Sequence, residues 1–174
     1  SADQLRRLLA ACRSCQDRWG RDAYDLFAIM GNFGPRISEA LDLGFNDFQP
    51  LRQDLFFFVR TLKKRGKNVP KDPRAGGMVS DRIYVSEEER GLLEEIVSHR
   101  SKMYREGGKL FRFTPTAGRK AFAYFAGLAG LPVRTSPHSL RHTAATMLTR
   151  ANNRIGIFAK VRLRHALSAT EQYT

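Results

Sequence analysis

Apolar residues recur along most of this chain at the spacing of amphipathic α-helices. In the first such stretch, Leu5, Leu8 and Leu9 share one side, and Ser1 and Asp3 are able to cap its start. The same pattern predicts helices over residues 3–12, 22–32, 36–43, 86–104, 118–128 and 139–149, with two shorter segments over 154–163 and from 168 onward. The protein is therefore expected to be mainly helical.

Two short runs interrupt the helical pattern. Residues 55–59 (LFFFV) and 82–85 (RIYV) are rich in aromatic and β-branched side chains, which is typical of β-strands. The residues between the runs include three glycines and two prolines, so they are expected to form a long loop. The sequence thus predicts an α+β protein, mainly α with a small antiparallel β-sheet.

Local signals mark two of the helix starts. Ser86 followed by Glu89 has the spacing of a capping box, in which each residue binds the backbone N–H of the other. Gly34 and Pro35 break the chain after the second helix. Because proline is tolerated in the first turn of a helix, a new helix is expected from Arg36.

The length of 174 residues, without repeats or linkers, suits a single domain over 1–174. No stretch approaches the ~18 consecutive apolar residues of a membrane span, and the N-terminus lacks a signal-peptide pattern, so a cytoplasmic protein is expected. Cys12 and Cys15 are too few for a disulfide framework. Since no second pair exists, they are expected to be structural thiols rather than a zinc or redox site.

Charge is both large and segregated. The chain has 30 Lys and Arg against 17 Asp and Glu, a formal net charge of +13. Between Gly107 and Thr170 there are eleven Lys and Arg and no Asp or Glu, and a second basic group lies within residues 55–80. This distribution predicts a basic face that binds a polyanion, nucleic acid before an acidic membrane. The missing carboxylates also argue against a two-metal nuclease, and no metal is expected.

The most informative string is HSLRHT at 138–143. A helix that begins near Ser139 places His138 and Arg141 on one side. The planar fork of arginine matches phosphate oxygens and histidine moves protons near neutral pH, so the pair suits phosphoryl chemistry. On spacing alone, however, a histidine and an arginine on one helix face are more often a structural pair. Arg36 by itself is likewise better interpreted as an exposed helix-start residue that pairs with Glu39.

Together with two other strings, this motif resembles the boxes of the tyrosine recombinases, the family of phage integrases and Xer-type recombinases. GPRISEALDL at 34–43 resembles the first box, and HSLRHT at 138–143 resembles the start of the second box. LRHALSATEQYT at 163–174 resembles the end of the second box. The strings occur in the family's order and span nearly the whole chain. The resemblance implies the tyrosine recombinase catalytic-core fold and site-specific DNA recombination through a 3′-phosphotyrosyl intermediate, with no cofactor.

The resemblance also implies roles for individual side chains. Tyr173 matches the nucleophile that attacks a DNA phosphodiester. Arg36 and Arg141 match the arginines that hold the non-bridging oxygens of the scissile phosphate, where negative charge grows in the transition state. His138 matches the residue that handles the proton of the tyrosine, and His165 the histidine that donates a hydrogen bond to the phosphate.

A lysine completes the set as the general acid for the departing 5′-oxygen. The family keeps this lysine on or just after the strand that precedes the hairpin turn. Lys63 is our choice there, with Lys64 as the alternative and Lys67 or Lys71 behind them. Contacts to the DNA backbone are expected from Lys64, Arg65, Lys67, Arg162 and Arg164.

Two other functions stay open. A type IB topoisomerase shares the Arg, Lys, His and Tyr set and would relax DNA of any sequence. A member that only binds DNA is the second, because His165 and Tyr173 are eight positions apart, one fewer than expected of the family, and Arg164 stands where glycine is common.

The resemblance further implies partners and context. The family's N-terminal DNA-clamping domain is not in this sequence, which stops one residue after Tyr173, so a catalytic-domain fragment is expected. Its partner would be double-stranded DNA, bound as a homo-tetramer on paired sites, with room for accessory DNA-bending proteins. Its location would be the nucleoid.

Overall fold

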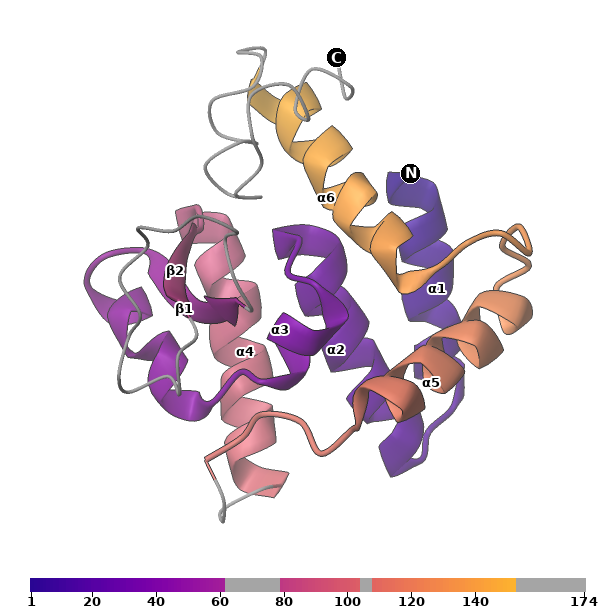
Figure 1. Ribbon diagram of the computed structural model, residues 1–174, viewed down its shortest axis with the longest axis horizontal. Coiled ribbons are helices and arrows are strands. Elements are labelled where there is room, and N and C mark those ends of the chain that lie inside the picture. The colour runs from indigo at the N-terminus through magenta and orange to yellow at the C-terminus, as the bar shows by residue number, and fades with distance from the viewer. Residues whose placement is uncertain (62–78, 104–107, 153–174) are drawn as a thin grey trace. The chain divides into compact units, whose positions relative to one another are not determined.

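The structure, a computed structural model, describes residues 1–61, 79–103 and 108–152. It is mainly helical with one two-stranded antiparallel sheet, as predicted (Figure 1). The elements are α1 (Ala2–Ser14), α2 (Arg18–Phe33), α3 (Ile37–Leu41), the 3₁₀ helix η1 (Phe45–Arg52), β1 (Phe56–Thr61), β2 (Val79–Tyr84), α4 (Glu87–Met103), α5 (Pro115–Leu128) and α6 (Pro137–Asn152). The predicted loop after β1 and the two predicted C-terminal helices lie outside the described residues.

The described part of the chain divides into two compact units, Ser1–Ala40 with the residues from Phe113 onward, and Leu41–Arg112. In the first unit, α1, α2, α5 and α6 pack around an apolar core (Figure 1). Its buried side chains include Leu5, Leu8, Leu26, Phe27, Phe122, Phe125 and Ala144. None of the described helices is both long and apolar enough to cross a membrane.

Capping side chains determine where the helices of the first unit begin. Asp17 accepts a hydrogen bond of 2.7 Å from the N–H of Gly20, so α2 begins at Arg18, earlier than its apolar pattern indicates. Thr114 has the same function for α5, which begins at Pro115 rather than at the predicted residue 118. Apolar periodicity locates the middle of each helix, whereas the cap determines its first residue.

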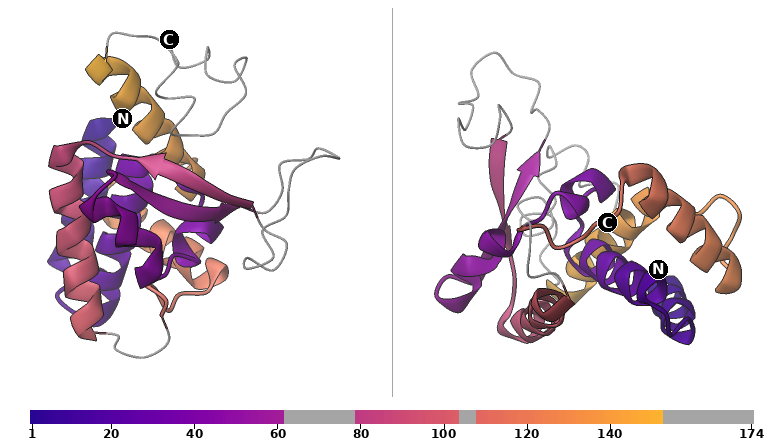
Figure 2. Two further views of the ribbon diagram at one scale, coloured as in Figure 1. Left: turned by 90° about the vertical axis from the view of Figure 1, so that its left-hand side faces the viewer. Right: turned by 90° about the horizontal axis from the view of Figure 1, so that it is seen from below.

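In the second unit, β1 and β2 run side by side (Figure 2). Their antiparallel register pairs Phe57 with Ile83. Both side chains are fully buried, and the ring of Phe48 stacks on Phe57 with centroids 5.1 Å apart. The predicted capping box opens α4: the Glu89 N–H donates to Ser86 Oγ at 3.2 Å, and the Ser86 N–H donates to Glu89 Oε2 at 2.8 Å.

The 3₁₀ helix η1, which the sequence analysis did not predict, is held by carboxylates. Asp47 Oδ2 accepts a hydrogen bond of 2.7 Å from the N–H of Gly44 at the start of η1. The same carboxylate oxygen pairs with Arg60 Nη2 of β1 at 2.8 Å, and Arg60 Nε pairs with Asp42 Oδ2 at 2.8 Å. Through these ion pairs, Arg60 holds β1 against Asp42, which precedes η1, and against Asp47 within η1.

The turn between α1 and α2 leaves no space for a side chain at position 20. A Cβ there would lie 2.1 Å from the carbonyl oxygen of Cys15 and 2.8 Å from that of Cys12, and neither backbone oxygen is able to move freely. We therefore expect Gly20→Ala to lower the free energy of unfolding by about 1–3 kcal/mol, measured by urea denaturation followed by circular dichroism. If Gly20→Ala unfolds with the same free energy as wild type, the turn has more space at position 20 than the structure shows.

A matched control for this substitution lies on α5. Gly127 is exposed, and nothing lies within 4 Å of a Cβ built there. Gly127 lies in the last turn of α5, and glycine is less favourable than alanine in a helix, so Gly127→Ala is expected to raise the free energy of unfolding by up to about 1 kcal/mol. The opposite signs of the two changes separate steric conflict from a general intolerance of alanine.

Candidate functional site

The structure describes three of the six side chains that the sequence analysis assigned to chemistry: Arg36, His138 and Arg141. All three belong to the first compact unit. The other three, and the residues expected to contact the DNA backbone, lie outside the described residues: Lys63, His165, Tyr173, Lys64, Arg65, Lys67, Arg162 and Arg164.

Arg141 is a buried cation. It is in α6, which packs against α2, and only 2% of its surface is exposed. Its Nη1 donates a hydrogen bond to the carbonyl oxygen of Gly34. Gly34 caps the C-terminus of α2 in the left-handed conformation, with φ of 74°, and precedes Arg36 by two positions. The buried guanidinium is therefore attached to the turn from which Arg36 extends.

Arg36 is held by Glu39. The backbone N–H of Arg36 donates to Glu39 Oε2 at 2.7 Å, and its Nη1 donates to Oε1 at 2.9 Å. The carboxylate is buried, with 4% of its side chain exposed, whereas 55% of the Arg36 side chain is accessible. The local pairing considered in the sequence analysis exists, and it leaves the guanidinium oriented by its partner yet open to a ligand.

Glu39 is a site residue that the sequence analysis did not propose. Its signal was present in the chain, because Arg36 and Glu39 are three positions apart at a helix start, the spacing at which side chains of opposite charge meet. The buried carboxylate of Glu39 fixes the direction of the half-exposed Arg36 guanidinium.

His138 lies in the first turn of α6, beside both arginines. Its pKa is lowered from the ordinary value of 6.5, first by desolvation and then by the positive charges of His142, Arg141 and Arg36. Near neutral pH the imidazole is therefore mainly uncharged, and an uncharged imidazole is able to accept a proton.

The described part of the site is thus a cationic cluster with one proton acceptor. The guanidinium group of Arg36 is half exposed, and that of Arg141 is buried against the Gly34 carbonyl oxygen. Guanidinium N–H donors are of the kind that match the oxygens of a phosphate. Within the described ranges, no group of three or more His, Cys, Asp or Glu side chains is arranged to hold a metal ion.

The two cysteines do not join this cluster. Burial raises the pKa of Cys12 to about 12. The pKa of Cys15 is also raised, mainly by its hydrogen bond to Asp17, in which Cys15 Sγ lies 3.2 Å from Oδ1. Because the thiolate is the reactive and metal-binding form, both environments favour the structural thiols expected from the sequence.

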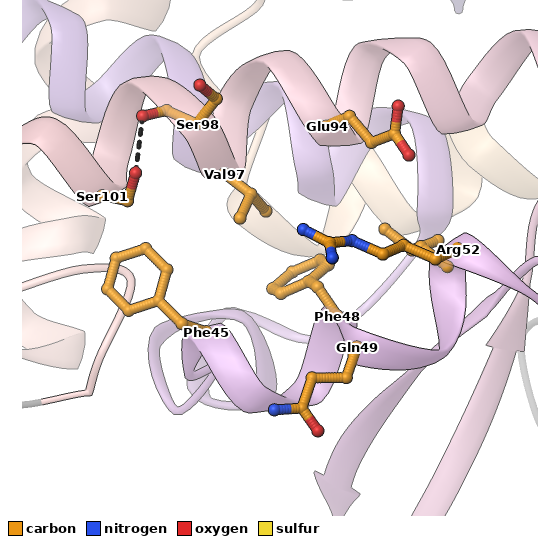
Figure 3. Close-up of a pocket in the computed structure, with 9 residues that line it drawn as sticks. Phe45, Phe48, Gln49, Arg52, Glu94, Val97, Ser98 and Ser101 are labelled. Carbon is orange, nitrogen blue, oxygen red and sulfur yellow. Dashed lines mark hydrogen bonds between the residues drawn. The ribbon is translucent and has the colours of Figure 1, made fainter.

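A hollow of about 780 Å³ lies in the second unit, between η1 and α4 (Figure 3). Its lining is a mixture of aromatic, aliphatic and polar side chains: Phe45, Phe48, Gln49, Leu51, Arg52, Glu94, Val97, Ser98 and Ser101. At its edge, Ser101 Oγ donates to the carbonyl oxygen of Ser98 at 2.8 Å. None of the described residues that were predicted to carry chemistry lines this hollow.

Comparison with solved structures identifies the fold. The crystal structure of XerA recombinase matches with a TM-score of 0.70 at 24% identity, over 99% of this chain and 58% of that chain. The catalytic domain of bacteriophage HP1 integrase matches with a TM-score of 0.63 at 20% identity, over 98% of this chain and 82% of that chain. The fold is therefore that of recombinase and integrase catalytic domains, as the boxes implied.

Comparison of sequences identifies the family. A tyrosine recombinase XerC from Rhodospirillum centenum (strain ATCC 51521 / SW) is 30% identical over 151 residues, which are 86% of this chain and 41% of that protein. This chain thus spans less than half the length of that relative. The model of the phage integrase family matches residues 1–174. The chain belongs to the phage integrase family.

Proposed function

We propose that this chain is the catalytic domain of a site-specific tyrosine recombinase, which cleaves and rejoins DNA strands through a 3′-phosphotyrosyl intermediate. The observation that carries the proposal is the attachment of buried Arg141 to the turn that holds Arg36, with His138 beside both. This arrangement offers directed cations and a proton acceptor to one phosphate. Family membership supplies the chemical context.

In the proposed cleavage step, the hydroxyl oxygen of Tyr173 attacks phosphorus, and the bond from phosphorus to the 5′-oxygen breaks. His138 accepts the tyrosine proton, and Lys63 donates a proton to the departing 5′-oxygen. Arg36 and Arg141 hold the non-bridging oxygens as their charge increases. The energy of the broken bond is retained in the phosphotyrosine, so a 5′-hydroxyl of a partner strand is able to reseal the backbone without ATP.

The proposed substrate is double-stranded DNA. The net charge of +13 favours it, and phosphate contacts should make affinity fall steeply with salt. Two solved relatives of this fold are DNA complexes: the XerH site-specific recombinase bound to its difH substrate and the Tn1549 transposon integrase with transposon end DNA. By analogy with the family, we propose that the protein acts on the nucleoid in the cytoplasm, as a tetramer on paired sites. The proposal also allows for accessory DNA-bending proteins.

Covalent trapping on a mixture of DNA sequences tests the proposal and selects the target at the same time. The chain is incubated with a pool of duplexes that carry a nick at a fixed position and randomised flanks, because loss of the short nicked fragment prevents resealing. We expect adducts that survive SDS, are destroyed by protease, and yield a shared sequence when the trapped DNA is read.

The other outcomes distinguish the alternatives. Adducts without sequence preference, together with relaxation of a supercoiled plasmid, would favour a topoisomerase-like activity. Retention of DNA with no adduct on the pool or on DNA that flanks the gene would favour a member that only binds DNA, and would contradict the enzymatic proposal.

A further inference from the structure

Arg60 is the penultimate residue of β1, and two carboxylates hold its guanidinium group. Nη1 and Nη2 donate to Asp47 Oδ1 and Oδ2 at 2.9 and 2.8 Å, and Nε donates to Asp42 Oδ2 at 2.8 Å. This pairing fixes the guanidinium in both position and plane, because each carboxylate oxygen takes a separate N–H. The Arg60 side chain is 27% exposed and that of Asp47 9%, so water and salt screen the contact only in part.

The segment that Arg60 binds is itself anchored in the second unit. Asp47 Oδ2 also accepts a hydrogen bond of 2.7 Å from the N–H of Gly44. The next backbone group, the N–H of Phe45, donates to the carbonyl oxygen of Gly108 at 2.9 Å. The ion pairs of Arg60 therefore connect β1 to a part of the fold that has its own backbone contacts.

Arg60 belongs to the outer face of β1. Side chains alternate along a strand, so Phe57 and Val59 are fully buried on the inner face, whereas Phe58 and Arg60 share the opposite face. In the described part of the chain the sheet has two strands, and a two-stranded ribbon is by itself only marginally stable. At this outer position the ion pairs supply the hold on the strand that burial supplies at Val59.

The lysine of the proposed mechanism follows this strand closely in the sequence. Lys63 is two positions after Thr61, the last residue of β1. A chain extends by at most about 3.6 Å per residue, so covalent geometry alone keeps the two Cα atoms within about 7 Å of each other. Because a general acid must come within about 3 Å of the atom that it protonates, the position of the strand end limits how well this lysine is placed.

We propose that Arg60 is a positioning residue for the general-acid step: by holding the end of β1 to Asp42 and Asp47, it confines the lysine that protonates the departing 5′-oxygen. This inference rests on the proposed function, in which Lys63 is that lysine. Since Arg60 acts through the lysine, its loss should slow departure of the leaving group and leave attack by the nucleophile unchanged.

A sulfur leaving group separates this role from a general loss of structure. The duplex has the sequence selected by covalent trapping, and sulfur replaces the 5′-bridging oxygen of the scissile phosphate. When the bond from phosphorus to sulfur breaks, a thiolate leaves, and it needs no general acid because a thiol ionises near pH ~8.5. Adduct formation is measured on the oxygen and the sulfur duplex, and the ratio of the two rates does not depend on the fraction of folded protein.

We expect Arg60→Met to lose about 10- to 100-fold in rate on the oxygen duplex and to stay within about twofold of wild type on the sulfur duplex, the pattern also expected of Lys63→Ala. Asp47→Asn, which removes the charge that Arg60 binds, should show a smaller loss of the same kind. Arg82→Met is the matched control. It removes a guanidinium from the same face of the hairpin, where Arg82 lies 4.8 Å from the ring centroid of Phe56, and should keep the wild-type ratio.

Hydrogen exchange of the whole chain tests the physical cause without DNA. Backbone amides of β1 and β2 should exchange faster in Arg60→Met than in wild type, while those of α2, in the first unit, should be unchanged. Unchanged exchange in the hairpin, or equal rate losses on the oxygen and sulfur duplexes, would overturn the proposal. If wild type forms adducts on neither duplex, the proposed function fails. If wild type forms them on both and Arg60→Met keeps the wild-type ratio, only the role of Arg60 fails.

Discussion

We expect Tyr173→Phe to form no covalent complex with DNA. Phenylalanine keeps the ring but lacks the oxygen that attacks phosphorus, so the rate of adduct formation should fall by roughly 10³-fold or more, to the limit of detection. The measurement is the SDS-stable adduct on the nicked duplexes. Retention of the same duplexes under native conditions, followed by fluorescence anisotropy, should be unchanged, because the ring is kept and no charge is altered.

A second tyrosine provides the matched control. Tyr124 is on α5, 51% exposed, with its ring against Trp19 at a centroid distance of 4.9 Å. Tyr124→Phe also removes a phenolic hydroxyl, and it should form adducts at the wild-type rate. If adducts persist in Tyr173→Phe, the nucleophile is another residue, and mass spectrometry of the DNA-linked peptide would identify it.

We expect Arg141→Lys to cleave DNA about 10²- to 10³-fold more slowly than wild type. Lysine keeps the positive charge, but it lacks the planar fork whose Nη1 donates to the Gly34 carbonyl oxygen. A single ammonium does not reproduce that fork for the carbonyl oxygen and for the phosphate oxygen that Arg141 holds in the proposed mechanism. The rate is measured at saturating DNA, so that a defect in the chemical step is separated from a defect in binding.

Stability must be measured beside the rate, because Arg141 is buried. Unfolding of Arg141→Lys by heat shows whether the variant is folded at the assay temperature. Arg119→Lys, at an exposed position of α5, is the matched control and should keep both the wild-type rate and the wild-type stability. A folded Arg141→Lys variant that cleaves at the wild-type rate would remove Arg141 from the proposed mechanism.

The regular helices were predictable because their stabilising signals are local. The capping box at Ser86 and Glu89 and the break at Gly34 and Pro35 both appear in the structure as the sequence indicated. Each depends on residues within one helical turn of one another, so a linear pattern contains the whole signal.

The 3₁₀ helix η1 was missed because its signal is not local. A 3₁₀ helix has three residues per turn, so the apolar spacing of an α-helix does not mark it. It is stabilised by the carboxylate of Asp47, which pairs with Arg60 of β1, thirteen positions later. Nothing in the segment by itself indicates that an arginine of a strand will meet it.

Part of the candidate site was also predictable from the sequence, and part was not. The boxes indicated Arg36, His138 and Arg141 as residues of one site, and the structure brings them together. The sequence did not indicate that Arg141 is buried, that it binds a helix-capping carbonyl, or that Glu39 orients Arg36. Those features depend on packing between distant segments. Lys63, His165 and Tyr173 stay predictions.

The hydrogen bond from Arg141 to Gly34 joins positions that are 107 residues apart in the chain. Contacts of such long sequence separation form only after the intervening segments have been synthesised and folded. A nascent chain that has not yet emerged from the ribosome as far as α6 therefore carries the turn at Gly34 without the guanidinium that binds its carbonyl oxygen. Arg36 and Arg141 come together only after α6 has been made.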